Sequence, residues 1–313
     1  MFEYLKICAV CVAVVAISYF AFEAPLSFDY PNIDVQADIS TTSVSVGNAS
    51  PTVSSIFLNS GEHIDLIEDN ATTVVATATV SDTNTYSNIV LVTGKLYRAG
   101  VSDGYNCIAD GNNCYVDSAC ATSSCSSNDC VATCQFNVWF IAEPTDAGSY
   151  SGQSWDAFIE ATDASSATGT ATNTVQAIDV KSLTAMNVSE TVAYGTLAPG
   201  VADASTTNLV LATTTGNEAI DGEISGTIMC TDYPGCSAYR IDSIAQHYAT
   251  STVDFGDGYV LSSTTPAALE FDTIKPNATP SNQAQNIYWG ISVPGGQAAG
   301  DYEGENTFTA VSD

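Results

Sequence analysis

The chain has 313 residues, of which 45% are hydrophobic and 13% charged, and its 35 acidic against 6 basic residues give a net charge of −29. The apolar content is enough for packed cores and excludes a wholly disordered chain. The few lysines and arginines are scattered along the sequence. They form no basic stripe that would neutralise phosphates, so the composition excludes nucleic acid as a partner.

The first feature along the chain is an apolar run from Ile7 to Phe22. The residues up to the end of this run include neither Pro nor Gly and predict an α-helix over residues 1–24, of which residues 1–22 would span roughly 33 Å. A cleaved signal peptide is the weaker interpretation, because Glu3 offsets the charge of Lys6 and the usual positive excess is missing. We therefore expect a retained helix, followed by a connector over residues 25–32.

A short apolar N-terminal helix that carries β-domains resembles the layout of type IV pilin-like subunits. In that family the helices pack in the core of a filament, and a glutamate near the start of the mature chain pairs with a neighbour's N-terminal amine. The resemblance implies that identical copies assemble into a helical filament after residing in the membrane, with Glu3 in the pairing role. The alternative is a plain membrane anchor that holds one copy at the cell surface. The residues expected to pack in the assembly helix are Phe2, Glu3, Ile7, Val10, Val14, Ile17 and Phe20.

From residue 33 onward, apolar and polar residues alternate at period two, which predicts β-strands separated by turns. The clearest alternations are Val74–Val80 and Ile287–Val293, whereas Asn173–Val180 reads as the last strand of a first domain. This pattern is typical of antiparallel sandwiches. We expect one sandwich over residues 33–180 and a second over residues 181–313.

Several stretches resemble bacterial Ig-like modules of exported surface proteins. They include VWFIAEPTDAGSY and DAFIEATD in the first half, and VAYGTLAPG, IYWGISVPGG and DYEGENTFTA in the second. The resemblance implies a tandem of Ig-like sandwiches and brings no catalytic residues. The expected fold class is therefore mainly β, with an N-terminal apolar α-helix followed by two Ig-like antiparallel β-sandwich domains.

Eight of the ten cysteines lie in the β-regions and predict disulfides in an oxidising, extracellular compartment. Six fall in an insertion at residues 101–134, which contains few large apolar residues and which we expect to be a cross-linked excursion on the sandwich edge. It serves either as a contact surface or as protease-resistant decoration. A zinc cluster is the competing interpretation, but close CxxC pairs are missing. We expect disulfides among Cys107, Cys114, Cys120, Cys125, Cys130 and Cys134 in an undetermined pairing, a disulfide between Cys230 and Cys236, and reduced Cys8 and Cys11.

The sequence contains no HExxH, P-loop or GxSxG motif, and neither histidine has motif context, so we expect no enzyme. Calcium is the only cofactor candidate, because carboxylate-rich loops supply hard oxygen ligands. Asp82 and Asp163 both end predicted strands and would meet at one pole of a sandwich, whereas Asp254 and Asp257 share one loop. Turn formation explains the same residues without a metal.

The Ser/Thr/Asn-rich composition contains four sequons for glycosylation, at Asn48, Asn70, Asn187 and Asn277. Taken together, the sequence predicts a structural, pilin-like subunit of an extracellular filament on the cell surface. The alternative is a monomeric, membrane-anchored surface or adhesion protein.

Overall fold

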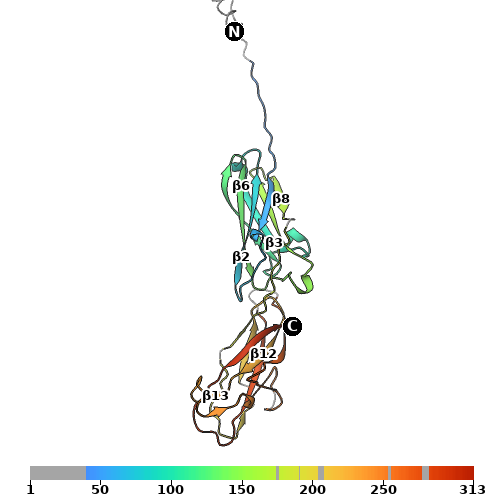
Figure 1. Ribbon diagram of the computed structural model, residues 1–313. Helices are drawn as coiled ribbons and strands as arrows, with labels where there is room; N and C mark the ends of the chain where they lie inside the picture. Colours follow the sequence, from blue (N-terminus) through green and yellow to red (C-terminus); the bar gives the residue numbers. More distant parts are fainter. Residues whose placement is uncertain (1–39, 174–175, 190, 204–207, 253–254, 277–281) are drawn as a thin grey trace, which may run out of the picture. The chain divides into compact units, whose positions relative to one another are not determined.

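The computed structural model describes residues 40–313, except for 174–175, 190, 204–207, 253–254 and 277–281 (Figure 1). The chain divides into two compact units, residues 1–47 and residues 48–313. In the first unit the described residues, 40–47, are exposed and belong to no strand. The second unit carries the described strands.

The strands of the second unit fall into two groups. The first group comprises β1 (Thr52–Leu58), β2 (Ala71–Ser81), β3 (Ile89–Arg98), β4 (Cys114–Asp117), β5 (Ala121–Ser126), β6 (Asp129–Trp139), β7 (Trp155–Asp163) and β8 (Thr168–Thr172). The second group comprises β9 (Met186–Val188), β10 (Ala202–Asp203), β11 (Leu209–Thr214), β12 (Ile220–Gly226), β13 (Met229–Cys230), β14 (Arg240–Ile241), β15 (Gln246–Ala249), β16 (Tyr259–Val260), β17 (Ala267–Thr273), β18 (Ala284–Ser292) and β19 (Asn306–Ser312). Short 3-10 helices occur at η1 (Asn59–Gly61), η2 (Tyr86–Asn88), η3 (Gly104–Asn106), η4 (Gly148–Tyr150) and η5 (Ser243–Ala245).

The predicted fold class is wrong in its helical part. The structure is mainly β, with 45% of its residues in strands, and no helix of seven or more residues occurs among the described ones. The predicted assembly helix over residues 1–24 and the connector over residues 25–32 fall outside the described residues. In the described residues, apolar side chains recur at period two, whereas a helix needs an apolar stripe at period 3.6. The helical turns there are 3-10 helices of three residues each. Within the described ranges, no helix is long and apolar enough to cross a bilayer.

The first group forms two antiparallel sheets with the orders β1-β2-β6-β5 and β4-β3-β7-β8. The longest pairing joins β2 to β6, from Ala71 opposite Trp139 to Ser81 opposite Asp129. The predicted alternation of Val74–Val80 is confirmed, because its four apolar side chains are buried between the sheets. They share one core cluster with Trp155 of β7. The first group is therefore a β-sandwich.

The cysteine-rich stretch contributes to this sandwich at the edges of its two sheets. The stretch supplies β4, which pairs with β3, and β5, which pairs with β6. Cys130, Ala132 and Cys134 lie on the buried face of β6, where the cysteines act as small core residues. The predicted disulfides are confirmed: the bonded pairs are Cys107–Cys114, Cys120–Cys134, Cys125–Cys130 and Cys230–Cys236.

One of these disulfides, Cys120–Cys134, ties the residue before β5 to the neighbouring strand β6 of the same sheet. Cys134 lies on β6, whereas the backbone N–H of Cys120 donates to the carbonyl of Val92 in β3. Gly94 of β3 lies against this bond, because a Cβ at that position would be 2.7 Å from the Cys134 Sγ and 2.9 Å from its Cβ. The absence of a side chain at Gly94 therefore leaves room for the disulfide against β3.

Replacing this glycine should overpack the core. We expect Gly94→Ala to lower the free energy of unfolding by about 1–3 kcal/mol, because the new methyl group would overlap the disulfide. Urea unfolding measures the change. Gly152→Ala is the matched control, since a Cβ there meets no atom within 4 Å. Equal stabilities of the two variants would contradict this account of the core.

The second group forms the sheet β16-β15-β18-β11-β9, with β10 beside β18, and the sheet β17-β12-β19. The alternation predicted at Ile287–Val293 is confirmed, since its apolar side chains are buried and lie in or directly after β18. Trp289 packs in a separate core cluster with Val210 of β11. The strand predicted at Asn173–Val180 is wrong for the described residues, which make only isolated bridges from Ile178 and Val180. The predicted boundary between residues 180 and 181 stays a prediction.

A buried ion pair lies beside the end of β3. Arg98 donates to Glu143, and the two side chains are only 8% and 9% exposed. Asn112 donates to the other oxygen of Glu143 at 3.0 Å, and the Lys275 Nζ donates to the Asn112 Oδ1 at 2.6 Å. Burial lowers the pKa of Lys275 to about 8, and Arg98 adds to this effect, whereas Glu143 and Asp110 oppose it.

This lysine should make stability depend on pH. An unfolded lysine has a pKa of about 10.4, so between roughly pH 8 and 10 the unfolded chain binds more protons than the folded one, and the free energy of unfolding rises with pH. Lys275→Met should remove that rise, as followed by urea unfolding at several pH values. Lys181→Met is the control, because its side chain is 39% exposed. A difference between wild type and Lys275→Met that stays constant over this window would contradict the assignment.

Candidate functional site: a groove beside β19

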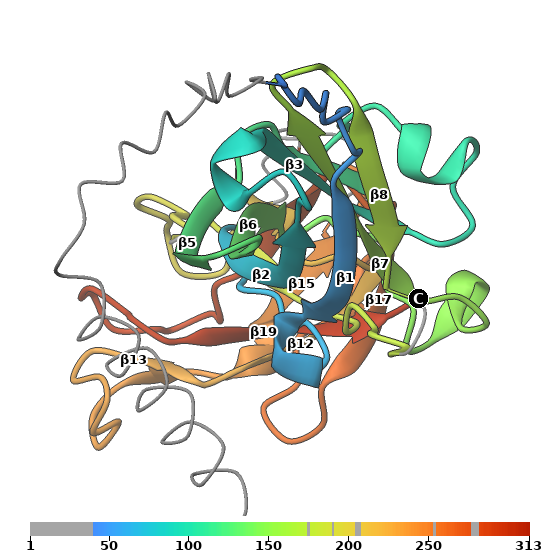
Figure 2. The ribbon, with the colours of Figure 1, turned by 90° about the horizontal axis from the view of Figure 1, so that it is seen from above.

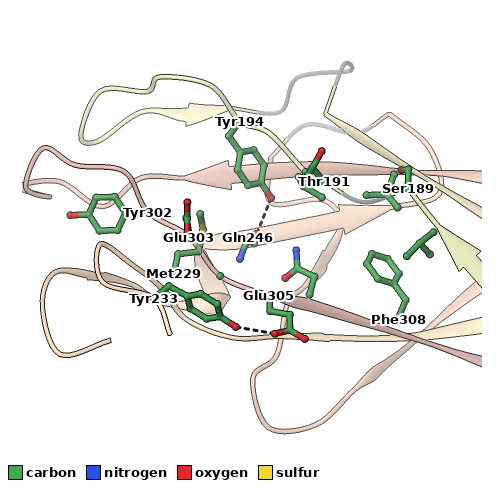
Figure 3. A pocket seen from close by; sticks show the side chains of 15 residues that line it. Ser189, Thr191, Tyr194, Met229, Tyr233, Gln246, Tyr302, Glu303, Glu305 and Phe308 are labelled. Atoms are coloured by element: carbon green, nitrogen blue, oxygen red, sulfur yellow. Dashed lines mark hydrogen bonds between the residues drawn. The ribbon is translucent and has the colours of Figure 1, made fainter. Parts of the chain in front are cut away.

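The second sandwich carries a groove of about 540 Å³ between residues 188–189 and 191–194 on one side and residues 302–308, where the last strand β19 begins, on the other. Figure 3 shows side chains from both walls turned toward the space between them. Its lining includes Val188, Ser189, Thr191, Val192, Tyr194, Val210, Met229, Tyr233, Gln246, Tyr302, Glu303, Gly304, Glu305, Asn306 and Phe308.

The position of the groove follows from how the sheets pair. In the first sandwich, β7 has β3 on one side and β8 on the other, and β8 lies beside β1 (Figure 2). In the second sandwich, β19 pairs with β12 along its whole length, and the described strands include no partner for its other side. The edge of β19 instead lies near β9. The groove therefore occupies the place in the second sandwich that β8 fills in the first.

The floor of the groove is apolar. Val188, Val192 and Phe308 are half-buried and pack against the second core. Val210, which also lines the groove, is itself a buried member of that core. The missing neighbour of β19 therefore leaves the edge of the core incompletely covered.

The rim of the groove is polar and acidic. The Tyr194 hydroxyl donates to the Gln246 Oε1 at 3.0 Å, and the Tyr233 hydroxyl donates to Glu305 at 2.9 Å (Figure 3). Burial raises the pKa of Tyr194, and the hydrogen bond to Glu305 raises that of Tyr233, so both phenols stay neutral. Among the described residues, the lining includes the glutamates Glu303 and Glu305 and no basic residue. Such a groove repels anions and suits a neutral or cationic ligand with an apolar face.

A second hollow of about 660 Å³ continues this groove, because it shares Val192, Tyr194, Met229, Tyr302 and Glu303 with the first. The two hollows therefore form one continuous space along the shared residues. The described residues of the two linings include no His, Cys or Lys.

The calcium candidates Asp82 and Asp163 do meet at one pole of the first sandwich, as their positions at strand ends predict. Both are buried, and amides connect them: Asn88 donates to Asp82 at 3.1 Å and to Asn48 at 3.3 Å, and Asn48 donates to Asp163 at 2.7 Å. The remaining carboxylate oxygens accept backbone N–H groups of the turns that follow the two aspartates. Turn formation and these hydrogen bonds therefore explain why Asp82 and Asp163 lie here without a bound calcium ion.

The other predicted positions are dispersed. Asp257 is exposed, and Asp254 lies outside the described residues. Three sequon asparagines, Asn48, Asn70 and Asn187, are exposed, whereas Asn277 is not described. The nearest approach to a metal cluster in the described ranges is Asp117 with Cys120 and Cys134, but the two sulfur atoms are bonded to each other.

No protein-family model matches this chain, and no curated protein matches it. Sequence reasoning missed the groove. No local pattern signals it, because the groove depends on how distant segments pair.

The pole of the first sandwich should be sensitive to acid. The hydrogen bond from Asn48 is the largest cause of the lowered pKa of Asp163. A lowered carboxyl pKa stabilises the fold above the unfolded value of about 3.9, and the contribution is lost as the pH falls through the folded value. Asn48→Ala should thus destabilise the protein at pH 6, and the difference from wild type should shrink toward pH 2.

Asn187→Ala is the control for this prediction, because Asn187 is exposed on β9. Urea unfolding across the acid range makes the comparison. A difference between wild type and Asn48→Ala that does not change with pH would refute the role of Asn48.

Proposed function

We propose that this chain is a structural protein of the cell exterior whose copies assemble into a filament that displays the β-sandwiches. The observation that carries the proposal is the combination of an uncharged apolar run, residues 7–22, with a β part in which eight cysteines form four disulfides. The disulfides are compatible with an extracellular protein. The strong negative charge keeps such domains soluble and apart from one another.

The apolar run supports assembly whatever conformation it adopts. Its large side chains gain about 1.5–3 kcal/mol each on leaving water, so they must be covered by other copies or by lipid. Coverage by copies gives a filament, and lipid would hold the chain before assembly. The alternative function is adhesion by a single anchored copy. The observation that favours it is the open groove, which could bind a chain from another protein.

The chemistry of the groove supports a binding role. Ser189 and Thr191 bring hydroxyls to the lining, but no histidine lies among the residues that would activate them. We therefore propose no catalytic activity for this site.

Removal of the apolar run tests the proposal. Deletion of residues 1–24 should yield soluble single copies and abolish filaments, as seen by electron microscopy and analytical ultracentrifugation. Val14→Asp should weaken assembly strongly, because it places a charge among apolar side chains that become covered. Ser27→Asp adds the same charge outside the run and should assemble as wild type does. A full-length chain that remains a single copy without detergent would refute the proposal.

A further inference from the structure

We propose that the groove beside β19 binds residues 40–46 of a second copy as an added β-strand. This inference rests on the proposed function, since it requires copies that assemble, and it names the contact that joins them. The donated strand would lie along the free edge of β19 and take the place that β8 has in the first sandwich.

The acceptor side is an incomplete sheet with an exposed core edge. The sheet β17-β12-β19 ends at β19 among the described strands, whereas its counterpart β4-β3-β7-β8 has four strands. An edge strand offers unpaired backbone N–H and C=O groups to another chain. Beside this edge, Val188, Val192 and Phe308 form an apolar floor. A strand with apolar side chains on one face would satisfy the edge and cover the floor at once.

The donor side is the segment 40–47, which is exposed and belongs to no strand. Val44 and Val46 are 88% and 80% exposed, and they alternate with Ser43 and Ser45. Alternate side chains of a strand point to the same face. In an extended conformation the two valines would therefore face the floor of the groove while the two serines face solvent.

Length and charge agree with this occupant. Residues 40–46 would span roughly 23 Å as a strand, and β19 has the same number of residues, seven. The segment 40–47 contains no charged residue, so it avoids the repulsion that an acidic segment would meet at Glu303 and Glu305.

Residues 40–46 cannot extend as far as the groove of their own chain, so the donor must be another copy. The next residue, Asn48, is hydrogen-bonded to Asp163 at the pole where β2 ends. The second sandwich contacts the opposite end of β2, where Thr215 donates to Glu68 at 2.6 Å. The eleven residues of β2 separate these ends by roughly 36 Å. Residues 40–46 are too short to cross that distance and still lie in the groove of their own chain.

A photo-crosslinking experiment on the assembled full-length chain tests the contact directly. Benzoylphenylalanine at position 44 should crosslink to the groove, at residues 188–192 or 305–308. The same group at position 43 faces the opposite side of the strand and is the matched control. Mixing ¹⁴N- and ¹⁵N-labelled copies shows by mass spectrometry whether a crosslink joins two copies. Crosslinks from position 44 that lie within one copy, or that map elsewhere, would overturn the inference.

Charge substitutions provide the second measurement. The double variant Val44→Asp/Val46→Asp should raise the concentration needed for assembly at least about tenfold, because two carboxylates replace side chains that become buried. Ser43→Asp/Ser45→Asp adds the same charge to the other face and should change it much less. If both variants assemble alike, the strand proposal fails while assembly itself stands. If the wild-type chain does not assemble at all, the proposed function fails.

Discussion

Each β-strand presents backbone N–H and C=O groups along two edges, and a strand that is paired on one side only leaves a row of them open to solvent or to another chain. The first sandwich places β8 beside β7 and brings β1 close to β8. In the second sandwich, β19 has β12 on one side and a groove on the other. This one open edge explains why Val188, Val192 and Phe308 stay half-buried and why a hollow lies at the start of β19, beside Asn306 and Phe308. The proposed contact between copies depends on it.

The two sandwiches complete their cores by different means. In the first, cysteines on the inner face of β6 replace larger apolar side chains, and a disulfide beside Gly94 ties β6 to the start of β5. This sandwich is cross-linked from within and needs no further strand. The second has one disulfide, at Cys230–Cys236, which closes a loop near the groove and not the edge of the core. A strand from outside would cover the edge of β19 as β8 covers the edge of β7 in the first.

Local pattern predicted much of this fold. The strands at Val74–Val80 and Ile287–Val293 were readable because a half-buried strand alternates at period two, and the meeting of Asp82 with Asp163 followed from their places at strand ends. Residues 121–126 escaped prediction as part of the sandwich because every side chain of β5 is exposed and none signals a core face. The pairing of the cysteines and the groove depend on which distant strands become neighbours. A single sequence does not encode those non-local choices in any local pattern, and no relative supplied them.

Amide hydrogen exchange in assembled and in dissociated protein tests the central claim most directly, because it reports on backbone hydrogen bonds. The account predicts that assembly slows exchange in residues 40–46 and along β19 together, while β8, which already has its place in a complete sandwich, exchanges equally in both states. Assembled material in which the amides of β19 exchange as fast as in single copies would contradict it.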